Sequence, residues 1–351
     1  MVHYTSQMAN NLAESVDTSL IAPEDCDHDY FDEKIDLRTV KTPPRGKWFN
    51  KDQLDIFKLF NLIREIDPDI IHISGNYIWI IGLFFFFKIK KYPVVVTLHD
   101  VNVHEGEDNF INRITNYIYL KMADHLIVHG IKLKEELLQN GIDEDIISVI
   151  NHGDYSFFTK HCKDDVEEDG SILFFGRIHD YKGLIYLFKA LEYIKKDIPH
   201  VNVIIAGRGN LEKYDHLIKD NSNLEIINRY IEDELVAELF QRASVVVMPY
   251  TEGSQSGIIP IAYSFKKPVV VTDVGSIPEV VEDGVTGFIV PPKDPEALAN
   301  ATLAILKNNQ LRKEMGSNAH KKMKDELSWD DISKRLTTIY QKVIDDTNES
   351  N

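Results

Sequence analysis

Runs of valine, isoleucine and other hydrophobic residues recur along this chain, and each run has the length of one strand. β-Branched side chains favour strands, and a continuous apolar run indicates a strand that is covered on both faces. Polar or glycine-containing segments bound the runs. The predicted strands are 19–22, 70–74, 94–99, 125–129 and 147–154 in the first half, and 171–176, 201–206, 224–227, 244–248 and 268–272 in the second.

Segments of helix length separate these strands. The first, Met1 to Val16, places Tyr4, Met8, Leu12 and Val16 on one face. Further helices are predicted at 53–66, 183–196, 257–266, 294–306 and 329–344. Strands that alternate with helices form parallel sheets, because each crossover helix covers one face. The pattern therefore predicts an α/β protein with doubly wound parallel sheets, interrupted by an irregular excursion at 24–50.

The alternation of strands and helices restarts after an acidic, polar stretch at 160–170. A chain of 351 residues exceeds what one ordinary core needs and suits two domains. We therefore expect a first domain at residues 1–158 and a second at residues 159–328. A final amphipathic segment, residues 329–351, follows them.

The charge balance limits the partners. The formal net charge is −17, which would repel the backbone of a nucleic acid, so no nucleic-acid partner is expected. Any phosphate site must then be locally basic. Cys26 and Cys162 lie far apart without the spacing of a metal site, which fits a reducing compartment. No signal peptide opens the chain, and a cytoplasmic location is expected.

One strongly apolar segment raises the question of membrane contact. Ile78 to Phe87 is apolar and aromatic, and Lys88 to Lys91 adds a basic flank. A membrane-spanning helix needs about 20 apolar residues, and this run has about half that number. It is either a buried crossover helix or a surface helix that dips its aromatic rings into a membrane interface. The second interpretation would place the protein at the inner face of a membrane as a peripheral protein.

A loop of small residues, Glu252 to Pro260, joins a predicted strand to a short helix. Ligands bind at such junctions in open α/β sheets, because unpaired N–H groups and the positive end of the helix converge there. An anion such as phosphate is the expected ligand, and Glu252 could accept hydrogen bonds from hydroxyls beside it. The alternative is ordinary turn chemistry. The residues at the centre of the loop are Ser254, Gln255, Ser256 and Gly257.

The second domain opens with a pair of cations. Gly176 ends its first strand, Arg177 leaves the strand, and Lys182 stands where the next helix begins. Both cations are expected at the edge of the sheet that carries the Glu252 loop. An arginine fork and a lysine suit a diphosphate, and they could stabilise the charge of a leaving group where other enzymes use a metal. The alternative is a solvated pair at a strand end.

Taken together, these segments resemble a GT-B glycosyltransferase of family 4, and the resemblance covers nearly the whole chain. In the second half it rests on Arg177 with Lys182, the Glu252 loop, Lys267-Pro-Val-Val-Val-Thr272, Gly275-Ser-Ile-Pro-Glu-Val-Val281 and Gly284-Val-Thr-Gly-Phe-Ile-Val-Pro-Pro292. In the first half it rests on Thr97-Leu-His-Asp100, His104 and Asn151-His-Gly153.

The resemblance implies two facing Rossmann-like domains, with the donor on the second and the final helix, 329–351, packed back toward the first. It implies retaining transfer of a sugar from a nucleotide sugar, a nucleoside diphosphate sugar donor, to a hydroxyl of a glycan or lipid-linked acceptor. Polysaccharide or glycolipid biosynthesis is the expected process. No metal and no further cofactor is expected.

By position, the resemblance also assigns roles to residues. Arg177 and Lys182 would hold the diphosphate and Glu252 the donor sugar. His99 would lie near the reacting centre, with Asp100 and His104 on the acceptor side. The backbone at Gly176 and the loop residues Ser254, Gln255, Ser256 and Gly257 would complete the donor site.

Two departures from the family pattern leave alternatives open. Where the family has a second glutamate, this chain has Pro260, or Ile261 if the loop is one residue longer, so the ribose needs another contact. The family also begins with a strand and a glycine-rich loop ahead of the first helix. We expect the natural protein to start upstream of Met1 or to be a truncated version, with a gap in its first sheet. The alternatives are a non-catalytic sugar-nucleotide-binding protein of this fold and a GT-B sugar-nucleotide epimerase.

Overall fold

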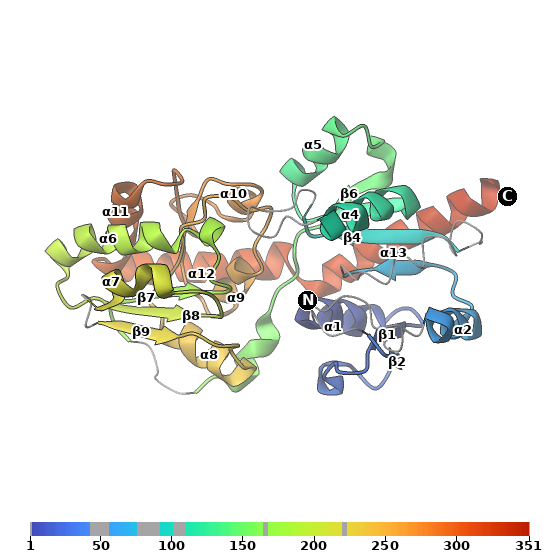
Figure 1. The fold of residues 1–351 in the computed structure, drawn as a ribbon, viewed down its shortest axis with the longest axis horizontal. Helices are drawn as coiled ribbons and strands as arrows, with labels where there is room; N and C mark the ends of the chain where they lie inside the picture. Colours follow the sequence, from blue (N-terminus) through green and yellow to red (C-terminus); the bar gives the residue numbers. More distant parts are fainter. Residues whose placement is uncertain are drawn as a thin grey trace.

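The computed structural model describes residues 2–42, 56–75, 92–100, 110–163, 168–219 and 223–350, and these form two lobes (Figure 1). Each lobe contains parallel strands with helices packed on them. The predicted α/β class with doubly wound parallel sheets is therefore confirmed. The helix α13 (Trp329–Ser350) extends from the middle of the molecule along the first lobe (Figure 1).

The second lobe is built on a six-stranded sheet in the order β9-β8-β7-β10-β11-β12. Its strands are β7 (Ser171–Phe175), β8 (Asn202–Ala206), β9 (Leu224–Ile227), β10 (Val245–Met248), β11 (Val269–Thr272) and β12 (Gly287–Val290). This is the order 3-2-1-4-5-6 of dinucleotide-binding folds. The direction of winding reverses between β7 and β10, and ligands bind at the carboxyl ends of strands at such a point.

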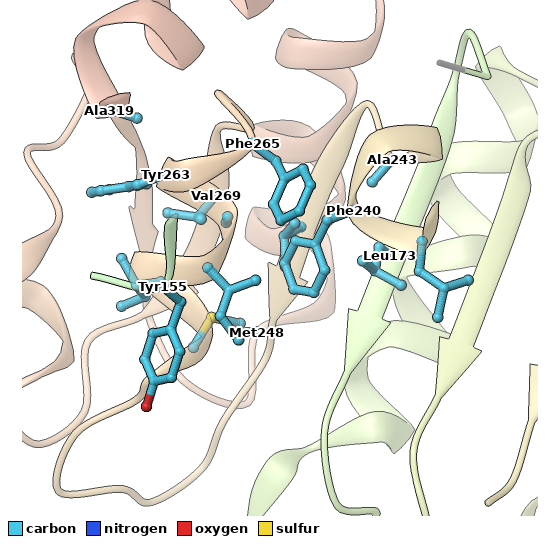
Figure 2. Packing of buried hydrophobic residues seen from close by; sticks show 14 of the residues in the cluster. Tyr155, Leu173, Phe240, Ala243, Met248, Tyr263, Phe265, Val269 and Ala319 are labelled. Carbon is cyan, nitrogen blue, oxygen red and sulfur yellow. The ribbon is translucent and has the colours of Figure 1, made fainter. Parts of the chain in front are cut away.

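Helices cover both faces of this sheet, which explains the continuous apolar runs. α6 (Leu184–Asp197) and α11 (Pro295–Leu306) pack with alternate strand residues such as Val245 and Val247. The other face packs against α8 (Asp233–Arg242), α9 (Ile258–Ser264) and α12 (Asn309–Glu326). Figure 2 shows part of this second core, with Leu173, Phe240, Met248 and Phe265 among its members. Because both faces are sealed, functional side chains of this sheet are confined to its edge.

The first lobe contains two separate sheets among the described residues. One has the order β3-β4-β5-β6, with β3 (Ile71–Ile73), β4 (Val94–Leu98), β5 (His125–Val128) and β6 (Ile147–Val149). The other pairs β1 (Ser19–Pro23) with β2 (Asp36–Val40) in parallel. No described strand joins the two sheets, and the expected gap stays a prediction.

Strand β2 corrects the prediction that residues 24–50 are wholly irregular. Asp36 and Arg38 are exposed and alternate with partly covered or buried residues, and among the described strands β2 pairs only with β1. A short, charged edge strand lacks the apolar run that reveals a central strand. The remaining excursion includes the 3₁₀ turn η1 (His28–Tyr30).

The helices of the first lobe are α1 (Val2–Leu12), α2 (Ile56–Ile66), α4 (Phe110–Met122) and α5 (Ile131–Gln139). In α1 the predicted apolar face is buried through Leu12, but the helix ends there, before Val16. The apolar segment Ile78 to Lys91 lies outside the described residues, and its two interpretations stay predictions. None of the described helices is long and apolar enough to cross a membrane.

The chain crosses between the lobes twice, and the two crossings are hydrogen-bonded to each other. The amide of Asp154 donates to the carbonyl of Leu327 at 2.9 Å, and Nε1 of Trp329 donates to the carbonyl of Asp154 at 2.8 Å. Beyond this point, α13 packs with α1 in a buried cluster that also includes Val95 of β4 and Ile127 of β5. The final helix therefore belongs structurally to the first lobe.

Candidate functional site

The loops that follow β7 and β10 are tied together at the carboxyl edge of the second sheet. The carbonyl of Tyr181 accepts hydrogen bonds from the amide of Thr251 at 2.8 Å and from its hydroxyl at 3.3 Å. Gly183 has a left-handed backbone with φ of 68°, and any side chain there would overlap the carbonyl of Pro249. Only glycine therefore allows the two loops to approach this closely.

This contact brings both predicted cations to one buried aromatic ring. Nζ of Lys182 lies 3.8 Å from the centre of the Tyr250 ring, in the geometry of a cation–π interaction. Burial raises the pKa of the Tyr250 hydroxyl, whereas the nearby Ser256 side chain and the positive charge of Arg177 lower it. Arg177 is exposed at the end of β7, and Lys182 is half-buried. Arg177 and Lys182 thus both lie near Tyr250, which stands two positions before Glu252, and their binding role stays a prediction.

The Glu252 loop itself presents polar groups of two kinds. Glu252 is exposed, whereas the side chain of Ser254 is buried. The Gln255 Oε1 atom is buried and has no hydrogen-bond partner among the described residues. A buried acceptor without a partner is costly, so a donor from outside the chain would stabilise it. Gln255 is therefore a candidate acceptor for hydroxyl or N–H groups of a ligand.

The loop ends at Gly257, immediately before α9. The hydroxyl of Ser256 accepts a hydrogen bond from the amide of Ile258 at 3.3 Å, and Pro260 is buried in the first turn. Because α9 has only seven residues, its macrodipole is small, and the expected phosphate contact there depends mainly on individual N–H groups. Pro260 and Ile261 offer no polar group to a ribose.

The first lobe faces Gly257 with a cluster of aromatic rings. Cε1 of His152 and the hydroxyl of Tyr155 lie 3.4 and 3.3 Å from the position that a Cβ atom of Gly257 would take. His152 packs against His129 at 5.1 Å between ring centres, and His129 packs against His99 at 4.9 Å. The predicted residue His99 therefore lies in a ring cluster at the boundary between the lobes.

His99 is held in one orientation and in its neutral form. Its Nε2–H group donates to the carbonyl of Ser74 at 3.1 Å, which leaves Nδ1 as an acceptor. Burial lowers its pKa, and this outweighs the opposing effects of the Ser74 bond and of the charge of Asp100. A neutral imidazole can accept or donate a hydrogen bond but adds no positive charge to a reaction centre.

Asp100 follows His99 at the carboxyl end of β4, and its carbonyl accepts a weak hydrogen bond from Asn116 at 3.5 Å. Its acceptor-side role stays a prediction. His104 lies outside the described residues, so its role stays a prediction as well. Among the residues that the structure does describe, no group of three or more histidine, cysteine, aspartate or glutamate side chains could hold a metal ion.

Tyr4, Tyr250 and His129 were not among the predicted site residues, and His152 entered the prediction only as part of Asn151-His-Gly153. Tyr4 contacts the rings of His99, His129 and His152 from α1, at 4.9 to 5.3 Å. Tyr250 sits under Lys182. The signal for His129 was available, since it stands where the predicted strand 125–129 ends. Tyr4 had none, because its spacing is that of an ordinary helix core.

Comparison with known proteins identifies the family. A model of Glycosyltransferase Family 4 matches residues 1–153, and a model of Glycosyl transferases group 1 matches residues 169–308. The chain is a family 4 glycosyltransferase. The predicted GT-B arrangement of two Rossmann-like domains is confirmed by solved structures: the structure of Anabaena HepE in complex with UDP has a TM-score of 0.75 at 17% identity, over 97% of this chain and 96% of that one.

Two curated relatives show the same relationship at the level of sequence. An uncharacterized glycosyltransferase of Methanocaldococcus jannaschii is 28% identical over 272 residues, which is 72% of this chain and 69% of the relative. The phosphatidyl-myo-inositol mannosyltransferase of Mycolicibacterium smegmatis is 24% identical over 293 residues, covering 82% and 74% of the two chains. The second lobe is called the donor domain below, and the first lobe the acceptor domain, after the roles that the family resemblance implies for them.

Proposed function

We propose that this family 4 glycosyltransferase moves a sugar, with retention of configuration and without a metal, from a nucleoside diphosphate sugar to a hydroxyl. The observation that carries the proposal is the joining of the β7 and β10 loops at the point where the winding of the sheet reverses. It brings Arg177, Lys182 and the Glu252 loop to one edge.

The chemistry of that edge suits a diphosphate leaving group. Arg177 can bind two phosphate oxygens with its fork, and Lys182 adds a point charge whose position is fixed over Tyr250. Two cations can stabilise the negative charge that develops as the sugar leaves, which is the task a metal performs elsewhere. Locally positive charge also overcomes the acidic background of the molecule.

The remaining polar groups suit the sugar and the attacking hydroxyl. Glu252 and the unpartnered Oε1 of Gln255 are hydrogen-bond acceptors for hydroxyl groups of the donor. His99 stands across the domain boundary, where its neutral ring can hydrogen-bond to the sugar at the reacting centre. Front-face attack, with the leaving phosphate accepting the proton of the acceptor, requires no strong protein base.

Relatives support a choice of donor and acceptor. HepE has been solved with UDP and with UDP-glucose, and the mycolicibacterial relative is named for mannosyl transfer to phosphatidyl-myo-inositol. We therefore propose a nucleotide-sugar donor, with UDP as the first nucleotide to test, and a glycan or lipid-linked acceptor in polysaccharide or glycolipid biosynthesis. Work at the inner face of a membrane would fit a lipid-linked acceptor.

Thermal unfolding with UDP, GDP and ADP tests the donor site. A ligand at about one hundred times its dissociation constant stabilises the protein by about 2.7 kcal/mol, or a few degrees for a domain of this size. One nucleotide is expected to raise the melting temperature of the wild type and of the control variant Arg64→Ala, which changes an exposed residue of α2. Arg177→Ala should abolish the shift. No shift with any nucleotide would contradict the proposed donor site.

A second candidate function is a sugar-nucleotide-binding protein of this fold without catalysis, favoured by the lack of a polar side chain at Pro260 and Ile261. It predicts nucleotide binding without turnover. A GT-B sugar-nucleotide epimerase is distinguished by its product, since it changes the sugar and glycosylates no acceptor.

A further inference from the structure

A carboxylate of the donor domain caps a helix of the acceptor domain. Glu279, on the short helix α10 (Ile277–Val280), accepts hydrogen bonds from the amides of Ile131 at 2.6 Å and Lys132 at 3.0 Å. These are the first two residues of α5, whose N-cap residue, Gly130, has no side chain with which to cap it. The first amides of a helix lack partners within the helix, and a negative charge beside them is favourable.

The backbone at Gly130 fits closely against α10. A Cβ atom at Gly130 would overlap the side chain of Ser276, and it would lie 3.1 Å from Oε2 of Glu279. Ser276 is itself buried at the N-cap of α10. We define the Glu279 clamp as Glu279 and Ser276 on the donor domain together with residues 130–132 on the acceptor domain. Its two sides lie about 150 positions apart in sequence, and they meet only when the domains approach as they do here.

Both ends of the clamp continue into the candidate site. On the donor side, the amide of Ser276 donates to the carbonyl of Ser254 at 2.9 Å, so α10 is attached to the Glu252 loop. On the acceptor side, Gly130 follows His129, whose ring packs against His99 at 4.9 Å. The clamp therefore connects the loop that would bind the donor sugar to the histidine that would face it.

A second contact joins the domains elsewhere. Asp233, in the first turn of α8, accepts a hydrogen bond from the hydroxyl of Tyr30 at 2.9 Å and lies 3.3 Å from Nε2 of His3. This contact shares no residue with the clamp. Loss of Glu279 should therefore leave the domains connected and release only the edge that carries α5 and α10.

We propose that Glu279 is a positioning residue for glycosyl transfer, which holds the acceptor domain closed on the donor loop by capping α5 across the domain boundary. The proposal rests on the proposed function for its catalytic consequence. Opening of the clamp would move His129 and His99 away from the Glu252 loop. It would leave Arg177 and Lys182 in place, since both belong to the donor domain alone.

The test compares Glu279→Gln with Glu282→Gln, which removes the same charge from an exposed neighbour. The amides of Ile131 and Lys132 donate to Glu279, and no described hydrogen bond joins them to Glu282. Gly130→Ala is the second variant, because it separates the two surfaces sterically and keeps the carboxylate. The readouts are amide hydrogen exchange of the peptide spanning residues 130–134, the dissociation constant for UDP, and kcat with the donor that binds. Exchange needs no turnover, so it tests the clamp even if the acceptor is unidentified.

Glu279→Gln and Gly130→Ala are expected to speed exchange at residues 131 and 132 about five- to tenfold with UDP bound, as loss of a charged cap and its hydrogen bonds implies. kcat should fall by a similar factor, with the UDP dissociation constant unchanged. Exchange and kcat equal to those of Glu282→Gln would overturn the proposal. If the variants still bind UDP when exchange and kcat are unchanged, the clamp proposal fails but the proposed donor site stands. Loss of UDP binding in the wild type would instead contradict the donor site, so the two failures are distinguishable.

Discussion

Mild acid is expected to destabilise the acceptor domain, because His72 and His152 are buried there as neutral rings. Burial lowers the pKa of each from 6.5 to about 3. The two ring nitrogens of His72 form hydrogen bonds with the hydroxyls of Tyr340 at 2.5 Å and Thr97 at 2.7 Å. In the neutral ring, one nitrogen donates and the other accepts. These bonds attach α13 to the sheet, so a proton on His72 would disturb the packing of the final helix.

The sign and size of the effect follow from proton linkage. The unfolded chain binds a proton at each histidine below pH 6.5, whereas the folded protein does so only near pH 3. The contribution of the two neutral rings to stability is therefore fully present above pH 6.5 and is lost as the pH falls toward 3. Between neutral pH and about pH 5, each buried histidine lowers the free energy of unfolding by about 2 kcal/mol, at about 1.36 kcal/mol per pH unit. The two together lower it by about 4 kcal/mol. That is a large part of the stability of a typical domain.

Urea unfolding followed by tryptophan fluorescence at about pH 7.5 and about pH 5 measures this loss. Each variant is compared with itself at the two pH values, so the cost of the substitution cancels. His152→Asn should reduce the loss by about 2 kcal/mol, because one shifted histidine is gone. His216→Asn, an exposed control, should leave it unchanged. If His152→Asn loses as much free energy of unfolding between the two pH values as the wild type does, the assignment of acid sensitivity to the buried histidines is refuted.

Two further predictions concern the donor domain. Gly183→Ala should lower the free energy of unfolding by at least about 2 kcal/mol, because alanine at φ of 68° is strained and its Cβ would overlap the carbonyl of Pro249. The affinity for UDP should fall as well. Unchanged UDP binding by calorimetry would contradict the role of the tied loops. Phe240→Ala should lower the free energy of unfolding by about 3 to 5 kcal/mol, since Phe240 is fully buried and packs against the rings of Phe175 and Phe265. Figure 2 shows Phe240 beside Phe265. The effect on UDP affinity should be small, and a loss of stability below about 1 kcal/mol would contradict the packing.

Much of the fold was predictable because the central strands carry a strong local signal. Val245 to Met248 and Val94 to Leu98 are sealed on both faces, so their sequences are continuously apolar. β2 was missed for the opposite reason. Its edge position tolerates Asp36 and Arg38, and nothing local separates such a segment from a loop.

The donor side of the site was predictable for a related reason. Parallel strands end at a common edge, so Arg177, Lys182 and Glu252 could be placed together from their positions after two strands. The acceptor side depends on the approach of two domains. Tyr4 of α1 meets His129, which follows β5, and Glu279 of α10 meets Ile131 of α5 only in three dimensions; no spacing along the chain indicates either contact.

The most direct test of the proposed reaction is transfer from the UDP-sugar that binds, in the presence of EDTA, with phosphatidylinositol and glycan acceptors. The account predicts acceptor-dependent release of UDP and a product whose anomeric proton, read by nuclear magnetic resonance, shows the configuration of the donor. Arg177→Ala should release no UDP. A product of inverted configuration, loss of turnover in EDTA that is restored by a metal, or an altered sugar without a glycosylated acceptor would contradict it.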